Sequence, residues 1–362
     1  MKRAALQATV GLLLLEGCLR VYNPLPSRVR GDRIVLPVRQ SYTFTNGGTH
    51  KLDPVTRHTK NSLGFRGPEP PSRWSEHFTI LTIGGSTTEC TFLSDGKTWT
   101  DRLARRIGEI RGDSWVNNAG LDGQSTFGHL VLMRQFVGTL HPSMVVFLVG
   151  ANDVERGAAN GYDVALTPQT GATVHRAAVF LADHTEIGSL ALNAVRAARA
   201  RHAGFGHSEV DLTTARRISL EPKEIERVLE GHRRAFVPDY RRRLADLMAF
   251  TRSYHIEPVL VTQPALFGDI VDPATHVDLR HVQVNGRGNG ELEWRLLELY
   301  NDVTREVGRD ADVPVIDLAR LMPKDSRYYY DFLHFTNEGA ARVGDIVFEG
   351  LATRLQQSKT VK

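Results

Sequence analysis

The sequence is poor in the features that identify disulfide-stabilised, zinc-binding and nucleic-acid-binding proteins. It contains only two cysteines, Cys18 and Cys90, which are too few for a disulfide framework. No group of cysteines and histidines has the spacing of a zinc site, and no His-Glu-x-x-His motif occurs. The basic residues lack interleaved aromatic residues or a recognition motif. We therefore expect no metal site and no nucleic-acid partner.

Internal repeats, low-complexity tracts and a strong charge excess are missing as well. Lysine and arginine number 45 and aspartate and glutamate 41, so the formal net charge is only +4. This small excess is compatible with an acidic substrate or a membrane surface but does not demand either. The length of 362 residues indicates one large domain with additions, or two domains.

The N-terminal segment has the form of an export signal, although its apolar run is short. Lys2 and Arg3 form a positive start, and residues 4–15 are largely apolar. A full membrane span needs about 17–25 residues, and no Ala-x-Ala cleavage site follows. We predict an anchor or signal helix over residues 1–22, which attaches the protein to the membrane of the cell envelope with its catalytic domain outside the cytoplasm. The alternatives are a lipoprotein, because Leu15-Glu16-Gly17-Cys18 is similar to a lipoprotein cleavage box, and a helix that only packs on the protein.

Residues 23–76 are rich in proline and carry only short strand patterns. The clearest are residues 33–36 and residues 41–45, which precede the turn signal Asn46-Gly47-Gly48. We predict an irregular, partly β extension here.

From residue 77 to residue 356 the chain alternates buried strands with helical stripes. This alternation predicts an α/β domain with a doubly wound parallel sheet. A long insertion interrupts it at about residues 155–221. Its arginines Arg196, Arg199 and Arg201, like Arg241-Arg242-Arg243 in the next helix, are predicted to lie on solvated faces, with an acidic-substrate patch as the alternative for the first three. The five predicted strands are residues 78–83, 114–118, 144–149, 258–262 and 313–317.

The most informative stretch is the first of these strands and the residues directly after it. Gly84 and Gly85 permit a tight turn and a close backbone approach, and Ser86 follows at the carboxyl end of the strand. If a helix begins there, its N–H groups and dipole favour negative charge beside the serine hydroxyl. By itself, the pattern also fits an ordinary turn with a capping serine.

Other stretches supply the partners that a nucleophilic serine needs. In Asp331-Phe332-Leu333-His334, an aspartate precedes a histidine by three residues, so it can orient the base that activates a serine. Asn118-Ala119-Gly120 and Gly150-Ala151-Asn152 each follow an apolar run. A glycine N–H and an asparagine amide are suitable donors to an oxyanion.

These pieces, in this order, resemble the SGNH (GDSL-type) hydrolase superfamily. Ser86, Gly120 and Asn152 match its block I, II and III residues, and Asp331 with His334 matches its block V. The resemblance implies a three-layer αβα fold with a five-stranded sheet in flavodoxin-like order. It also implies a Ser86–His334–Asp331 triad and an oxyanion hole formed by Ser86, Gly120 and Asn152, with no cofactor.

One block departs from the usual family pattern, because the serine lies in Gly-Gly-Ser-Thr-Thr rather than Gly-Asp-Ser-Leu. This variant resembles a bacterial, often membrane-anchored subgroup. Residues 61–67 resemble a segment that precedes the catalytic domain in the same subgroup. For that segment we expect a strap that packs through Leu63 and Phe65, with substrate contact by Arg66 as the alternative.

The sequence thus predicts a serine esterase that hydrolyses small acyl esters, with acetyl esters of a carbohydrate as the expected substrate. An O-acyltransferase that uses the same triad on an envelope polysaccharide is the first alternative. A catalytically inactive envelope-binding module is the second.

Overall fold

The computed structural model describes residues 2–23, 29–30, 33–155, 172–202, 207–284 and 288–360. The chain forms two compact units. The first combines residues 1–37 with residues 159–206, and the second combines residues 38–158 with residues 207–362. The insertion predicted at about residues 155–221 is therefore shared between the units, and its described end, from residue 207, belongs to the second.

The first unit joins the N-terminal helix to the two helices of the insertion. The carboxylate of Glu16 accepts the backbone N–H groups of Glu186 (3.0 Å) and Ile187 (3.1 Å), where negative charge favours the start of a helix. None of the helices in the described ranges is long and apolar enough to cross a membrane. The side chains of Arg196, Arg199 and Arg201 lie outside the described residues. The elements of this unit are α1 (Lys2–Val21), β1 (Val29–Arg30), β2 (Arg33–Ile34), α6 (Ala172–His184) and α7 (Glu186–His202).

The second unit is built on a five-stranded sheet in which every neighbouring pair is parallel. Its strand order, β6-β5-β7-β8-β9, confirms the predicted doubly wound sheet in flavodoxin-like order. The last strand is shorter than predicted, because Val313 donates its N–H to Gly308 and Pro314 has no N–H to give. The strands are β5 (Phe78–Gly84), β6 (Ser114–Asn118), β7 (Met144–Val149), β8 (Glu257–Thr262) and β9 (Val315–Ile316).

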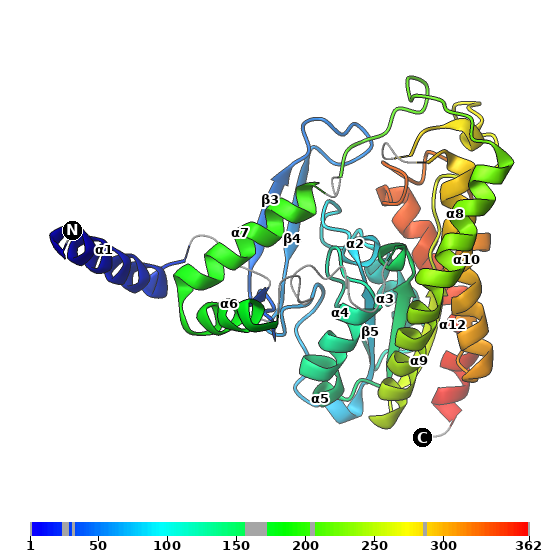
Figure 1. Ribbon diagram of the computed structural model, residues 1–362. Coiled ribbons are helices and arrows are strands. Elements are labelled where there is room, and N and C mark those ends of the chain that lie inside the picture. The colour runs from blue at the N-terminus through cyan, green and yellow to red at the C-terminus, as the bar shows by residue number, and fades with distance from the viewer. Residues whose placement is uncertain are drawn as a thin grey trace. The chain divides into compact units, whose positions relative to one another are not determined.

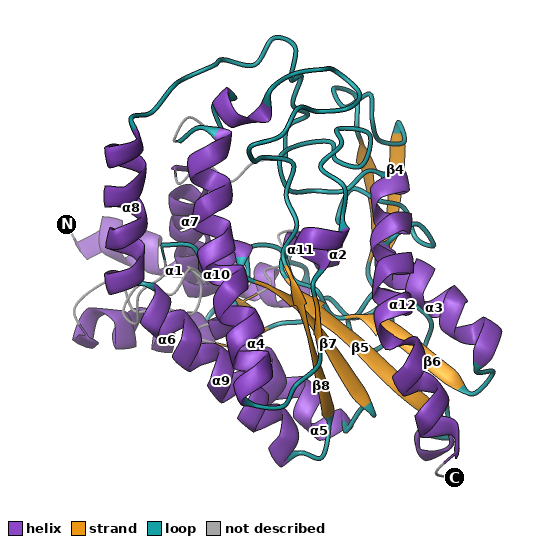
Figure 2. Cartoon of the chain, turned by 90° about the vertical axis from the view of Figure 1, so that its right-hand side faces the viewer, coloured by secondary structure: helices purple, strands orange, loops and turns teal. Residues whose placement is uncertain are grey.

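Helices cover both faces of this sheet, which confirms the three-layer architecture (Figure 2). On one face α3 (Trp99–Ile110) packs against α12 (Asn337–Thr360), and the side chains of Trp99, Leu103 and Ile107 are fully buried. On the other face α9 (Val237–Ser253) packs between α4 (Thr126–Leu132) and α10 (Gly290–Asp310). The remaining helical segments are η1 (Trp74–Glu76), α2 (Ser86–Glu89), η2 (Met133–Val137), α5 (Gly138–Leu140), η3 (Ala151–Asp153), α8 (Pro222–Ala235), η4 (Leu279–His281) and α11 (Leu318–Leu321).

The part of the extension that belongs to the second unit contains a separate antiparallel hairpin (Figure 1). Its strands are β3 (Ser41–Thr45), as predicted, and β4 (Val55–Thr59). Alternate residues of the second strand and the segment after it are buried, namely Thr56, His58 and Lys60. The strap that follows packs through Phe65, which is 1% exposed.

Candidate functional site

The turn after β5 brings Ser86 to the carboxyl edge of the sheet. Both glycines before the serine are required by close packing rather than by an unusual φ. A Cβ on Gly84 would lie 2.1 Å from the hydroxyl oxygen of Thr88, and one on Gly85 would lie 2.1 Å from Nδ2 of Asn152. A helix begins at Ser86, as expected, but α2 has only four residues. The dipole of so short a helix is small, so the local N–H groups matter more than the dipole.

Ser86, His334 and Asp331 form a continuous hydrogen-bonded chain. Nε2 of His334 lies 2.7 Å from the hydroxyl oxygen of Ser86, and Nδ1 lies 2.6 Å from Oδ2 of Asp331. Since a carboxylate only accepts, Nδ1 donates to Asp331 and Nε2 is left to accept from the serine. The other oxygen of Asp331 accepts the backbone N–H groups of Leu333 (2.8 Å) and His334 (2.7 Å). This arrangement can remove the proton from the serine hydroxyl.

The charges in this chain are matched to that task. Burial opposes the ionisation of Asp331, but the charge of His334 and the hydrogen bonds from its ring and backbone outweigh it and lower the pKa of the carboxyl. Burial likewise disfavours a charged His334, but the carboxylates of Asp331 and Asp122 outweigh it and raise the pKa of the imidazole. The histidine is therefore a stronger base than its burial alone would allow.

The predicted oxyanion donors occupy different positions. Asn152 lies beside the serine turn, where its Nδ2 occupies the space that a Cβ on Gly85 would need. The same nitrogen donates to the carbonyl of Gln124 at 3.0 Å. Gly120 lies behind α2, where a Cβ would meet the backbone nitrogen of Glu89 at 2.4 Å, and its N–H donates to the side chain of Asn118 at 2.9 Å. The geometry thus gives Gly120 a packing role, and its predicted donation to an oxyanion would require that hydrogen bond to be given up.

Gly123, which no sequence motif singled out, lies in the loop next to the serine turn. It has a left-handed φ of 75°, and the carbonyl of the next residue, Gln124, lies against Gly85 and accepts from Asn152. Among the described residues, no backbone carbonyl accepts the N–H group of Ser86 or of Gly123. The signal was present in the sequence as the turn pair Asp122-Gly123.

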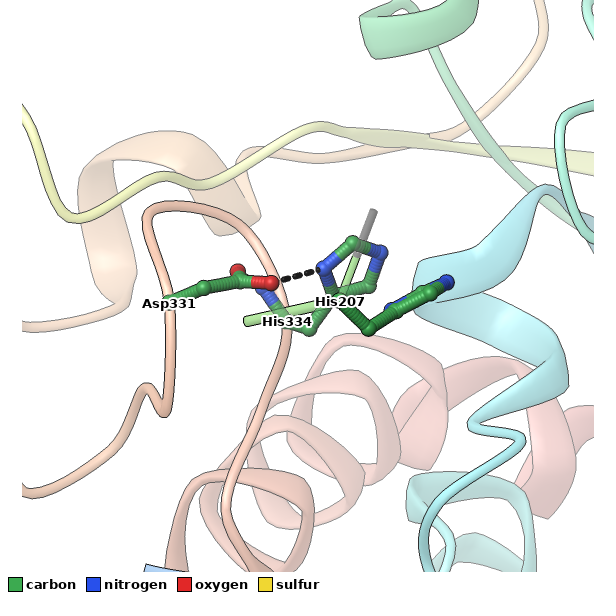
Figure 3. A group of neighbouring side chains, drawn as sticks. All are labelled: His207, Asp331 and His334. Carbon is green, nitrogen blue, oxygen red and sulfur yellow. Dashed lines mark hydrogen bonds and ion pairs between the residues drawn. The ribbon is translucent and has the colours of Figure 1, made fainter. Parts of the chain in front are cut away.

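Two aromatic side chains enclose the histidine. The Tyr330 ring stacks on that of His334, with centroids 5.6 Å apart. The centroid of the His207 ring lies 4.1 Å from that of His334 (Figure 3). His207 Nδ1 is 2.9 Å from the Tyr330 hydroxyl, and its Nε2 is 3.4 Å from Asp122. No sequence motif marks His207, which comes 127 residues before its neighbour His334.

Within the described ranges, His207, Asp331 and His334 also form a group that could hold a metal ion, with ligand atoms within 4.8 Å of one another. Asp331 and His334 are, however, already joined by the 2.6 Å hydrogen bond, and His334 by the 2.7 Å bond to Ser86. The donor set fits a proton chain at least as well as a cation. The expectation that no metal takes part stays a prediction.

Two arginines of the second unit, Arg66 and Arg243, are buried. Arg66 is 2% exposed and donates to backbone carbonyls, which supports the strap interpretation over substrate contact. Arg243 was predicted to be solvated, and that is wrong: it is buried and donates to the carboxylate of Asp153 at 3.2 Å. Asp153 also accepts from Thr126, so the ion pair secures the turn that carries Asn152.

Comparisons with known proteins identify a family for this chain. The GDSL-like lipase/acylhydrolase family model matches residues 82–342, most of the chain. The esterase TesA of Pseudomonas aeruginosa is 30% identical over 81 residues, which are 22% of this chain and 40% of that protein. The chain therefore spans less than half the length of this relative.

Solved structures of similar fold include three esterases or lipases. An acetyl xylan esterase, AlAXEase, is 12% identical with a TM-score of 0.43, covering 75% of this chain and 99% of that one. The acetylxylan esterase Axe2 of Geobacillus stearothermophilus is 13% identical with a TM-score of 0.44, covering 75% and 93%. The lipase/acylhydrolase of Enterococcus faecalis is 19% identical with a TM-score of 0.41, covering 76% and 96%. The membrane-anchored subgroup stays a prediction, but the family match confirms the predicted superfamily and enzyme class: the chain belongs to the GDSL-like lipase/acylhydrolase family.

Proposed function

We propose that this protein is a serine esterase that hydrolyses small acyl esters, acetyl esters of a carbohydrate being the expected substrate. The observation that carries the proposal is the unbroken chain from Asp331 through His334 to Ser86. An assembled chain of this kind is not needed by a module that only binds, so it argues against the inactive alternative.

In the proposed reaction, the hydroxyl oxygen of Ser86 attacks the ester carbonyl while Nε2 of His334 takes its proton. The N–H groups of Ser86 and Gly123 and the amide of Asn152 stabilise the oxyanion. His334 then returns the proton to the leaving alcohol, and an acyl group remains on Ser86. A water molecule, deprotonated by the same histidine, releases the acid. Asp331 holds the histidine in the required tautomer throughout.

The choice of an acetylated carbohydrate rests on the names of similar structures, the acetyl xylan esterases, and on family resemblance. The test is hydrolysis of 4-nitrophenyl acetate, of longer acyl homologues and of acetylated xylo-oligosaccharides by the full chain. Acetyl release from the sugars at a kcat/KM above that for the longer chains is expected. A preference for long acyl chains would contradict the substrate but leave the serine mechanism in place.

The alternative of acyl transfer uses the same acyl-enzyme, with a sugar hydroxyl in place of water. Adding an oligosaccharide acceptor to the assay separates the two. Free acetate that is unaffected by the acceptor supports hydrolysis, whereas an acetylated acceptor formed at the expense of acetate supports transfer.

We further propose that α1 attaches the protein to a membrane surface in the cell envelope. Four consecutive leucines, Leu12 to Leu15, are 48–67% exposed in the structure, which is unusual for apolar side chains. The test is flotation of the full chain with vesicles of anionic phospholipid, against a variant in which these four leucines are replaced by serine. Equal flotation of both would contradict the proposal.

A further inference from the structure

The residue three positions after Ser86 is a glutamate with no exposed surface. The carboxylate of Glu89 lies 3.0 Å from the ammonium group of Lys60, which is itself 4% exposed. Its other oxygen accepts the backbone N–H of Asp122 at 2.7 Å. One buried carboxylate thus links α2, the extension and the loop that carries Gly123.

A second cation of the extension holds the other end of α2. Arg66 donates to the carbonyl oxygens of Glu89 (2.8 Å), Cys90 (2.7 Å) and Leu93 (2.8 Å). The last carbonyls of a helix have no partner within it, and here the chain leaves the helix through Cys90 with a left-handed φ of 51°. The guanidinium group therefore fixes the path of the backbone directly after the serine turn.

Burying charged side chains costs desolvation free energy. Apolar side chains of similar volume often stabilise a fold as well or better. Unlike an apolar side chain, the carboxylate forms a directional hydrogen bond. It accepts the N–H of Asp122, the residue before Gly123, and so ties that loop to the helix that begins with Ser86.

We propose that Glu89, neutralised by Lys60, is a positioning residue that holds the loop of Gly123, the proposed oxyanion donor, beside the serine turn. The extension from Val55 to Arg66 is then part of the catalytic site rather than an addition to the domain. This inference rests on the proposed role of Ser86.

The experiment compares two double variants that both remove the buried charges. Glu89→Gln with Lys60→Met keeps an oxygen that can accept from Asp122, whereas Glu89→Leu with Lys60→Met does not. We expect the Leu/Met variant to have a kcat on 4-nitrophenyl acetate about 10–100-fold below that of the Gln/Met variant, because a small misplacement of catalytic groups has an effect of this order. KM and melting temperature should be similar in the two.

Equal kcat values in the two variants would overturn the inference, because the pair would then be only structural. If the Leu/Met variant does not fold, Glu89→Asp decides: it keeps the charge but withdraws the oxygens by one methylene. A reduced kcat with unchanged KM supports positioning, and a full kcat contradicts it. Ser86→Ala in the wild-type background keeps the two proposals apart, because activity retained there would overturn the serine mechanism whatever the Glu89 variants do.

Discussion

Two carboxylates stand three residues from a central group of the proposed site, and their surroundings differ. Asp331 precedes His334 by three residues and is bonded to its ring and to two backbone N–H groups. Glu89 follows Ser86 by three residues and is bonded to Lys60 and to one backbone N–H. An imidazole exchanges a proton near neutral pH, while an ammonium group ordinarily does not. The first carboxylate can therefore assist proton transfer by the imidazole that it holds, whereas we assign the second a positioning role.

Ser86→Ala tests the catalytic group that Asp331 serves through His334, and it should have the largest effect on activity. Without the nucleophile, we expect kcat to fall by roughly 10⁴–10⁶, as in other serine hydrolases. The melting temperature should change little, because Ser86 is only partly buried. Ester turnover and calorimetry of the purified variant check both points. Activity near that of the wild type would remove Ser86 from the mechanism.

Asn152 tests whether the donor side of the site is chemical or structural. If its amide stabilises the oxyanion, Asn152→Ala should lower kcat by roughly 10²–10³ with KM little changed. Asn152→Asp should be at least as harmful, because a carboxylate repels the developing charge. If the residue only shapes the turn, the aspartate should substitute well. Steady-state kinetics of the two variants distinguish these outcomes.

Gly120 and Gly123, in the loop that Glu89 holds, test which glycine N–H group acts as the oxyanion donor. Gly123→Ala forces a side chain into a left-handed φ of 75°, at a cost of about 1–2 kcal/mol, and should move the proposed donor. We expect about a tenfold loss of kcat, smaller than the loss of a whole donor. Gly120→Ala should instead lower the melting temperature, because its Cβ would lie 2.4 Å from the Glu89 backbone nitrogen. The reverse pattern would restore Gly120 as the donor.

The smallest expected effect concerns pH. His334 must be neutral to accept the serine proton, so kcat/KM should fall as the pH drops through its raised pKa. Asp122 contributes to that rise. Asp122→Asn should therefore lower the pKa of His334 and move the acidic limb of the kcat/KM profile to lower pH. The control is Asp211→Asn, which removes a surface carboxylate and should leave the limb in place.

The parallel sheet was predicted from local patterns, whereas its strand order and the Ser86–His334–Asp331 chain were predicted from motifs that resemble a known family. Buried strands such as Met144–Val149 are continuous apolar runs, and the Asp-x-x-His spacing suits one loop. Lys60 and Arg243 were not predicted as buried, because charged residues are usually solvated and only tertiary contacts with Glu89 and Asp153 reveal the exception. Gly120 was predicted from its motif match alone, and Gly123 was not considered, because sequence spacing does not say which N–H of a loop faces the serine.

The buried position of Cys90 has a practical consequence for labelling. Burial raises the pKa of its thiol to about 12, so it forms almost no thiolate at neutral pH. The other cysteine, Cys18, is exposed on α1. A thiol-selective reagent should therefore react with Cys18 and leave Cys90 unmodified, although Cys90 lies only four residues after Ser86. The sequence thus provides a single labelling site on the N-terminal helix without an engineered cysteine.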